Sequence, residues 1–200
     1  CKKIMSYYFT RIPTIIQQLF PNFTWKIKSE FVYLTFDDGP HPEYTPKILD
    51  ILRERNIKAT FFVLGDKCQE YPQILKQIEN DGHAIGFHGH RHKKINDLNP
   101  KEFERLFVLP NELKMAKLFR PPYGRIGINA SKEIQKRFKI ILYSIVLGDF
   151  DSSVTVNKML SRSKKIKRGD IVLLHDTKKT CSFLTEFLKD SHRYKFNSIT

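Results

Sequence analysis

The sequence predicts an α/β fold in which a mostly parallel sheet is covered by helices. Apolar segments rich in β-forming residues alternate with segments of helical periodicity along the chain. The expected strands are almost continuously apolar, which is typical of parallel strands buried on both faces. Periodicity alone allows a (β/α) barrel or a doubly wound sheet. A barrel is favoured because polar side chains follow several different strands, and (β/α) barrels build their sites at the carboxyl ends of the strands.

The expected elements follow one another without a linker or an internal repeat. Strands are expected at 31–36, 59–65, 83–88, 117–120, 139–149 and 169–176. Helices are expected at 45–56, 71–82, from 99 until Pro110, and at 129–138, 155–166 and 182–190. In the first helix, the apolar residues would form one face; they are Ile48, Leu49, Ile51 and Leu52.

Length and composition fit a single domain. The chain has 200 residues, of which 40% are hydrophobic, enough for a sizeable core. We expect residues 31–200 to form this domain and residues 1–30 to form an N-terminal segment that packs on it. The cysteines, Cys1, Cys68 and Cys181, are too few and too far apart for a disulfide scaffold or a zinc knuckle.

The chain is strongly basic, with 35 lysines and arginines against 21 acidic residues and a formal net charge of +14. Such a surface attracts anionic partners. The basic residues are scattered instead of forming one block, which disfavours nucleic-acid binding. No run approaches the roughly 20 apolar residues of a membrane helix. Arg11 and Pro13 interrupt the apolar stretch near the start, so it is not a signal-peptide core.

The first expected strand runs directly into two carboxylates, Asp37 and Asp38. Adjacent like charges at the mouth of a hydrophobic strand repel each other and resist desolvation, which a bound cation or a nearby arginine can offset. The third strand ends in "HGHRH", where His88 and His92 would share one face of a helical turn and His90 would point elsewhere. A carboxylate with two histidines is a recurrent ligand set for a catalytic transition metal, most often zinc.

Three later strand ends carry further reactive side chains. "RPPYG" supplies Arg120 and Tyr123, "GDFD" supplies Asp149, and "LLHD" supplies His175. Each segment alone could also be a structural feature without a catalytic role, such as a solvated turn, a rigid loop or a helix cap. Five such segments in this order, each at a strand end, are much harder to obtain by accident.

Together, "TFDDGP", "HGHRH", "RPPYG", "GDFD" and "LLH" resemble, in order, the five motifs of the polysaccharide deacetylase family, the NodB-homology domain of carbohydrate esterase family 4. The resemblance runs from about residue 32 to 176. It implies that residues 31–200 are a catalytic domain with a distorted (β/α) barrel and an incomplete ring of strands. It also implies hydrolysis of N- or O-acetyl groups on chitin oligomers, peptidoglycan or xylan with a divalent metal. Zinc is expected, with cobalt, nickel and manganese as alternatives.

The resemblance implies a role for each matching residue. Asp37 would be the general base and Arg120 its partner, while Asp38, His88 and His92 would hold the metal. Amide hydrolysis is consistent with these roles, because it needs an activated water, a stabilised oxyanion and a proton for the leaving nitrogen.

The other implied roles concern the leaving group and the substrate. Asp149 would orient His175, the general acid, and the backbone N–H of Tyr123 would serve the oxyanion. The implied substrate-binding residues are Pro121, Tyr123, Phe150 and Leu173.

Some positions depart from the family pattern. Gly89 stands where a serine or threonine is usual, Lys93 where a proline is common, Val146 where an aspartate is frequent, and Phe150 in place of a tryptophan. None removes an implied catalytic group, so we expect them to affect substrate choice more than activity. We interpret His90 as a solvent-facing residue and not as an extra ligand.

Two alternatives stay open: a catalytically silent carbohydrate-binding relative and a basic nucleic-acid-binding protein. The expected partner is an acetylated polysaccharide or oligosaccharide, bound by a monomer. Such a substrate lies in the cell envelope or outside the cell, although no signal peptide is visible in the chain. The aromatic residues Tyr7, Tyr8, Phe9 and Phe20 could bind sugar, but we favour packing over the barrel. Asp151 is interpreted as a solvated turn residue.

Overall fold

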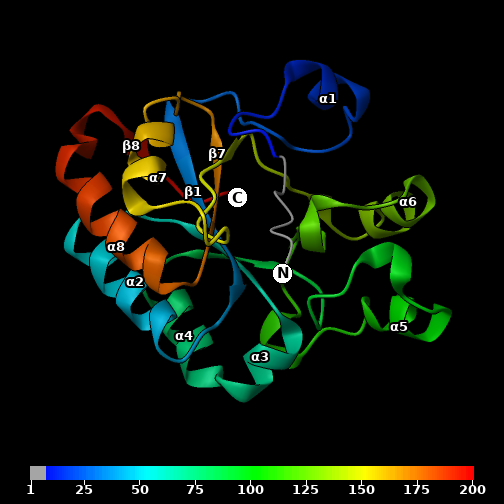
Figure 1. Ribbon diagram of the computed structural model, residues 1–200. Helices are drawn as coiled ribbons and strands as arrows, with labels where there is room; N and C mark the ends of the chain where they lie inside the picture. The colour runs from blue at the N-terminus through cyan, green and yellow to red at the C-terminus, as the bar shows by residue number, and fades with distance from the viewer. Residues whose placement is uncertain (1–7) are drawn as a thin grey trace.

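The computed structural model describes residues 8–200, which contain one curved sheet of parallel strands (Figure 1). The strands are β1 (Phe31–Gly39), β2 (Thr60–Val63), β3 (Ala84–Phe87), β4 (Leu118–Phe119), β5 (Lys139–Ile140), β6 (Ile145–Val146), β7 (Ile171–His175) and β8 (Lys195–Phe196). Their order is β5-β4-β3-β2-β1-β7-β6, and β8 pairs with the start of β1. The predicted distorted barrel with an incomplete ring of mostly parallel strands is confirmed.

Apart from α1 (Thr14–Leu19), which belongs to the N-terminal segment, the helices pack around the sheet. The others are α2 (Tyr44–Glu54), α3 (Gly65–Glu70), α4 (Pro72–Asn80), α5 (Pro100–Arg105), α6 (Ile128–Gln135), α7 (Val156–Ser163) and α8 (Lys178–Phe187). Helices α2 and α7 both contact α8. Figure 1 shows α2, α4 and α8 together on one side of the molecule and α5 and α6 on the other.

The central strand β1 divides its side chains between two cores. Successive side chains of a strand point to opposite faces of the sheet. Leu34 and Phe36 are fully buried in the larger core beneath the helices. Tyr33 belongs to the smaller core inside the curve of the sheet. Thr35 and Asp37 have the same parity as Tyr33 and therefore point into the barrel interior.

The N-terminal segment lies across the open side of the ring. Strands β5 and β6 form the two ends of the strand order. At β6, the N–H of Val146 donates to the carbonyl of Thr10 at 2.8 Å, and next to β5 the N–H of Thr24 donates to the carbonyl of Ile140 at 2.9 Å. Residues 10–24 therefore pair with backbone groups at both edges of the sheet, which edge strands otherwise leave unsatisfied.

One expected strand is divided in two. Residues 139–149 form the short strands β5 and β6 instead of one continuous strand. The physical reason is that β5 pairs with β4 at one end of the strand order and β6 pairs with β7 at the other, so the chain crosses the open side of the ring between them. Between the two strands, the carbonyls of Ile141 and Leu142 accept hydrogen bonds from the guanidinium of Arg120 at 3.3 and 3.1 Å.

The helix expected from 99 until Pro110 is also shorter. It begins as its sequence indicates, with a capping box between Asn99 and Glu102, but ends at Arg105. Proline disfavours the helical conformation of the residue before it, here Leu109, so the chain turns before reaching Pro110. No periodicity predicts α1, α3 or β8, because these elements are only 6, 6 and 2 residues long.

Among the described residues, no helix combines the length and the apolar character needed to cross a membrane. Cys68 is buried, Cys181 is partly buried, and both are free thiols. Cys1 and Tyr7 lie outside the described residues.

Candidate active site

Most of the predicted site residues converge on one cavity at the carboxyl ends of the strands. The cavity has a volume of about 550 Å³. Its walls come from the ends of β1 and β7, the loops after β3 and β4, the chain around β6 and the N-terminal segment. The predicted residues in its lining are Asp37, Asp38, His88, His92, Tyr123, Phe150, Leu173 and His175.

A bulge at the end of β1 allows two adjacent carboxylates to reach this cavity. In a regular strand Asp38 would point away from Asp37. The register of β1 against β2 shifts between Asp37 and Gly39, and Asp38 has a φ of 71°. This left-handed conformation is uncommon outside glycine but is more accessible to aspartate than to most residues. It turns Asp38 toward the loop after β3, while Asp37 stays in the barrel interior.

Asp37 forms a buried ion pair with Arg120. The Arg120 Nη1 atom lies 2.6 Å from Asp37 Oδ1, and both side chains are almost completely buried. The same nitrogen donates to the Thr35 hydroxyl at 2.7 Å, and the guanidinium lies 4.0 Å from the centre of the Phe62 ring. Burial raises the pKa of Asp37, and the Arg120 charge acts in the opposite direction. The arginine is therefore held rigidly where it favours the ionised carboxylate.

Asp38, His88 and His92 place three donor atoms around one point. The Nε2 atoms of His88 and His92 lie 3.5 and 3.4 Å from Asp38 Oδ1, and the three potential ligand atoms lie within 4.8 Å of one another. The Nδ1 atom of His88 lies 2.7 Å from the carbonyl of Arg120. A carbonyl can only accept, so Nδ1 carries the proton and Nε2 presents its lone pair to the cluster. Burial lowers the pKa of His88 to about 3, which keeps the ring neutral.

Asp38 has an oxygen that the protein does not satisfy. Its Oδ1 atom is buried and has no hydrogen-bond partner among residues 8–200. Buried polar atoms are rarely left unpaired, because desolvation without a partner is costly. A divalent cation between the three donors would remove that cost, and two imidazoles with one carboxylate suit zinc and its neighbours. Asp38, His88 and His92 therefore fit a metal site.

The histidine loop differs from its expected shape. Residues 88–92 contain no helical turn. Instead, Gly89 has a φ of +85°, where a side chain would be strained. The Nε2 atom of His90 lies 2.8 Å from the carbonyl of Arg105, and its side chain is only 17% exposed. The interpretation of His90 as solvent-facing is therefore wrong, although it lies outside the three-donor cluster as expected.

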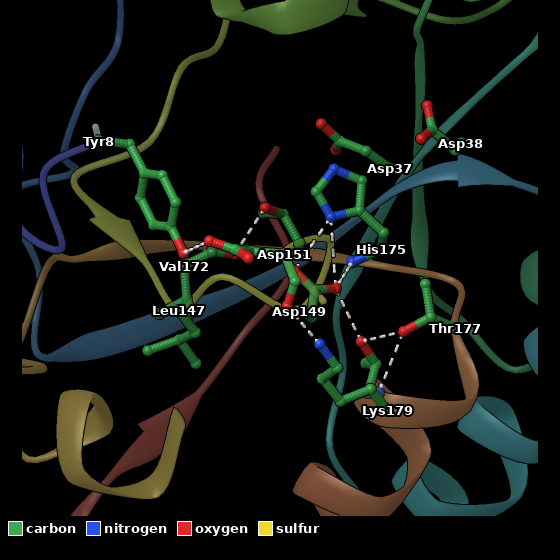
Figure 2. A network of polar contacts seen from close by, with 12 residues as sticks. Tyr8, Asp37, Asp38, Leu147, Asp149, Asp151, Val172, His175, Thr177 and Lys179 are labelled. Carbon is green, nitrogen blue, oxygen red and sulfur yellow. Dashed lines mark hydrogen bonds and ion pairs between the residues drawn. The ribbon is translucent and has the colours of Figure 1, made fainter. Parts of the chain in front are cut away.

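His175, at the end of β7, is held by Asp149. The His175 Nδ1 atom lies 3.1 Å from Asp149 Oδ1, and the other carboxylate oxygen accepts from the His175 N–H at 2.6 Å and the Thr180 hydroxyl at 2.8 Å. Figure 2 shows the imidazole with Asp149 on one side and Asp37 on the other. Burial lowers the pKa of His175, but the carboxylates of Asp149, Asp37 and Asp38 outweigh it and raise the pKa to about 9.

The predicted substrate-binding residues have different surroundings. Tyr123 is 52% exposed, its ring centre lies 4.3 Å from that of His92, and its φ is 61°. A non-glycine residue in this conformation stores strain, which is frequent at functional sites. Phe150 and Leu173 line the cavity. Pro121 is buried, and the cavity lining formed by the described residues does not include it.

Other residues of the lining lie outside the motifs. They are Tyr8, Ile12, Lys94, Arg125, Tyr143 and Thr177. Lys94 and Arg125 closely follow the second and third motifs, and their charge is the signal that could have identified them. Tyr8 and Ile12 are far from every motif, and only the fold brings them to the cavity.

As a bland alternative, Asp176 of "LLHD" could be the N-cap of the following helix, but the structure gives it a different position. The cap of α8 is Thr177, whose side chain accepts from the Thr180 N–H. Asp176 is 6% exposed and is bonded to the hydroxyl of Thr45. Burial raises the pKa of Asp176 to about 7.

The curved parallel sheet and the polar cavity at its strand ends define a half-barrel protein with a candidate metal centre. The sequence pattern of the polysaccharide deacetylase family matches residues 26–139. The chain belongs to this family.

Individual relatives agree with this assignment. The chain is 38% identical over 156 residues to a peptidoglycan-N-acetylglucosamine deacetylase of Bacillus cereus, covering 73% of this chain and 56% of that protein. It thus spans little more than half the length of that relative. It is 34% identical over 155 residues to a chitooligosaccharide deacetylase of Azorhizobium caulinodans, covering 72% of this chain and 73% of that protein. A crystal structure of a peptidoglycan N-acetylglucosamine deacetylase is similar with a TM-score of 0.82 at 29% identity, over 94% of this chain and 95% of that one.

Proposed function

We propose that this protein is a metal-dependent hydrolase that removes N-acetyl groups from a polysaccharide of the peptidoglycan or chitin type. The observation that carries the proposal is the pairing of two polar clusters around one cavity. One cluster is a three-donor set at Asp38, and the other contains Asp37 with Arg120 and His175 with Asp149. The named activities of the relatives described above support the same reaction class.

Asp38, His88 and His92 would hold the metal, for which zinc is the first candidate. When bound, a divalent metal supplies Lewis acidity, which lowers the pKa of water toward neutrality and polarises the acetyl carbonyl. The neutral His88 ring presents its Nε2 lone pair and the Asp38 Oδ1 atom has no hydrogen-bond partner among the described residues, so both atoms can coordinate a metal ion.

Asp37 would act as the general base. It faces the same cavity as the metal cluster, and its Oδ2 atom lies 3.8 Å from His88 Nε2. Arg120 holds the other oxygen, so the carboxylate is fixed in orientation, and the Arg120 charge opposes the rise in the Asp37 pKa that burial causes. An ionised carboxylate in this position can accept a proton from a water that attacks the acetyl carbon.

His175 would act as the general acid. An amine anion is a very poor leaving group, so nitrogen must gain a proton as the C–N bond breaks. The raised pKa of about 9 keeps His175 protonated at neutral pH. The backbone N–H of Tyr123 would donate to the oxyanion of the tetrahedral intermediate.

The substrate that best fits the cavity is an anionic glycan. Lys94 and Arg125 line the same cavity as the three-donor cluster, and the chain carries a net charge of +14. A carboxylate-bearing glycan such as peptidoglycan would be attracted to these groups, whereas neutral chitin oligomers would not. O-acetyl esters form a second substrate class, because they need the same base and oxyanion donors.

Released acetate from a panel of substrates tests this proposal. The panel contains peptidoglycan fragments, chitin oligomers, acetylated xylan and a simple aryl acetate, each with zinc-loaded protein and with chelator. We expect acetate from the N-acetylated glycans, abolished by chelation. Absence of acetate from every substrate with zinc-loaded protein contradicts the proposed function.

A further inference from the structure

Tyr8 contributes to the cavity from outside the family match. The match begins at residue 26, yet Tyr8 and Ile12 line the cavity together with Asp37 and His175. The packing role favoured for Tyr8 from the sequence is therefore incomplete, because part of this residue faces the space that substrate would occupy.

The Tyr8 ring and hydroxyl are both held in place. Its ring centre lies 5.1 Å from that of Phe150, which in turn meets the His175 ring edge-on at 5.4 Å. The Tyr8 hydroxyl donates to Asp151 Oδ2 at 3.2 Å and accepts from Arg162 Nη1 at 2.9 Å. Figure 2 shows Tyr8 extending toward Asp151 on the side of His175 away from Asp38.

Asp151 is the centre of this attachment, besides lying in a turn as expected from the sequence. Besides Tyr8, its carboxylate accepts from the N–H and hydroxyl of Ser153 at 2.9 and 2.7 Å. Its backbone carbonyl accepts from Lys179 at 2.6 Å. The loop that carries Phe150 is thereby fixed to α8 and to the N-terminal segment at once.

The backbone beside this loop is shaped to receive the Tyr8 hydroxyl. Gly148 has a φ of +89°, and a Cβ atom there would overlap the Tyr8 hydroxyl and the Arg162 guanidinium. Arg162 also donates to the carbonyl of Leu147 at 2.8 Å. A glycine at this point both permits the turn and leaves the space that the tyrosine fills.

Neighbouring residues prevent this part of the segment from moving independently of the barrel. The N–H of Ile12 donates to the carbonyl of Ser144 at 3.0 Å. Arg11 pairs with Asp170 at 2.7 Å, and the Asp170 side chain is fully buried. The pairing of Thr10 with β6 described above adds a third attachment, so Tyr8 is presented on a fixed backbone.

We propose that Tyr8 is a substrate-binding residue: with Phe150 it forms an aromatic wall that takes the apolar face of a pyranose ring next to the acetylated sugar. This inference rests on the proposed function for the identity of the ligand. Aromatic walls with a few fixed polar groups are the usual construction of sites for small organic ligands. The ring costs little to order on binding, because its hydroxyl and Phe150 already hold it.

The test compares Tyr8→Leu, Tyr8→Phe and Phe9→Leu. Tyr8→Leu keeps apolar bulk against Phe150 but removes the aromatic face, and Tyr8→Phe keeps the ring. Phe9 is the matched control, because it is the neighbouring aromatic residue but is 58% exposed and is not among the described cavity-lining residues. Each variant is assayed on an N-acetylated glycan oligomer and on an aryl acetate, which has no neighbouring sugar.

We expect Tyr8→Leu to raise KM for the oligomer about ten-fold and to change kcat less than about three-fold, with aryl acetate hydrolysis unchanged. Tyr8→Phe should stay within about three-fold of wild type in KM, and Phe9→Leu should match wild type. Equal losses of kcat on both substrates would mean that Tyr8 only supports the structure, and an unchanged KM in Tyr8→Leu would also overturn the proposal.

Failure of the proposed function gives a different result. Wild type would then release acetate from neither substrate, whereas the wall can still be tested by calorimetric binding of the oligomer to the same zinc-loaded proteins. Weaker binding by Tyr8→Leu than by wild type and Phe9→Leu supports the aromatic wall. Equal binding by all three proteins, or no binding by any of them, overturns it.

Discussion

Asp37 and Asp38 are neighbours in the sequence, but their surroundings in the folded protein are opposite. Asp37 is buried against Arg120, and one of its oxygens is paired with a guanidinium nitrogen at 2.6 Å. Asp38 faces two imidazole nitrogens, and its buried Oδ1 atom has no hydrogen-bond partner among the described residues. One carboxylate has its cation built into the chain, whereas the other is arranged around a cation that must be bound.

The different partners of Asp37 and Asp38 explain how two like charges can lie at the end of one strand. Ionised carboxylates this close together resist joint burial unless each has its own counter-charge. The bulge at Asp38 separates them, so that Asp37 points to Arg120 and Asp38 to the histidines. Because their partners differ, the two residues can perform different steps of one reaction.

Removing one of the proposed metal ligands is the strongest test of the metal site at Asp38. We expect His88→Ala to lose stoichiometric zinc and to lower acetate release by at least about 10³-fold, because the metal supplies several kcal/mol of stabilisation. Zinc content by atomic emission and acetate release by a coupled assay measure the two effects. The matched control is His90→Gln in the same loop, which should keep the metal. Full zinc content in His88→Ala would remove this histidine from the ligand set.

Neutralising Asp37 tests whether the two neighbouring carboxylates have different roles. Asp37→Asn should lower kcat by about 10² to 10⁴-fold, the usual contribution of a general base, while zinc content stays at the wild-type value. The same two measurements apply. If Asp37→Asn loses the metal, the division of labour between the neighbouring carboxylates is wrong.

The pH dependence tests whether His175 is used in its protonated form. Its pKa is raised to about 9, so activity should be present below that pH and be lost as pH rises through about 9. Asp149→Asn removes a charge that favours the imidazolium, so the alkaline limb should move toward the ordinary histidine value of about 6.5. The check is a pH–rate profile of both proteins with zinc present. An alkaline limb at the same pH in the variant contradicts the acid role.

The smallest expected effect concerns substrate charge. Replacing Lys94 and Arg125 by glutamine should raise KM for peptidoglycan fragments about three- to ten-fold at low salt, and less at high salt because exposed charges are screened. KM for neutral chitin oligomers should stay constant. Lys132→Gln, an exposed position on α6, is the control. Equal effects on both substrates would remove the preference for an anionic glycan.

The motifs predict the site better than periodicity predicts the fold around it. Asp37, His88, Arg120 and His175 were identifiable because each ends or follows a strand, and a parallel sheet brings those ends to one edge. The division of residues 139–149 was not predictable, since it depends on β5 pairing with β4 and β6 pairing with β7 at opposite ends of the sheet.

Tyr8 shows a second limit of the sequence. Its hydroxyl partner, Asp151, is 143 positions away, and neither residue belongs to a periodic pattern that would connect them. The positive φ of Asp38 was likewise invisible, because aspartate also adopts ordinary strand conformations. Contacts of this kind come from tertiary structure, and only the folded chain reveals them.

The central claim is that one carboxylate and two imidazoles hold a cation while the adjacent carboxylate does not. The direct measurement is an anomalous difference map from crystals of the zinc-loaded protein. We expect one peak at about 2.0–2.2 Å from Asp38, His88 and His92, with Asp37 still paired with Arg120. A peak that includes Asp37 as a ligand, a peak elsewhere, or no peak at full zinc loading would contradict it.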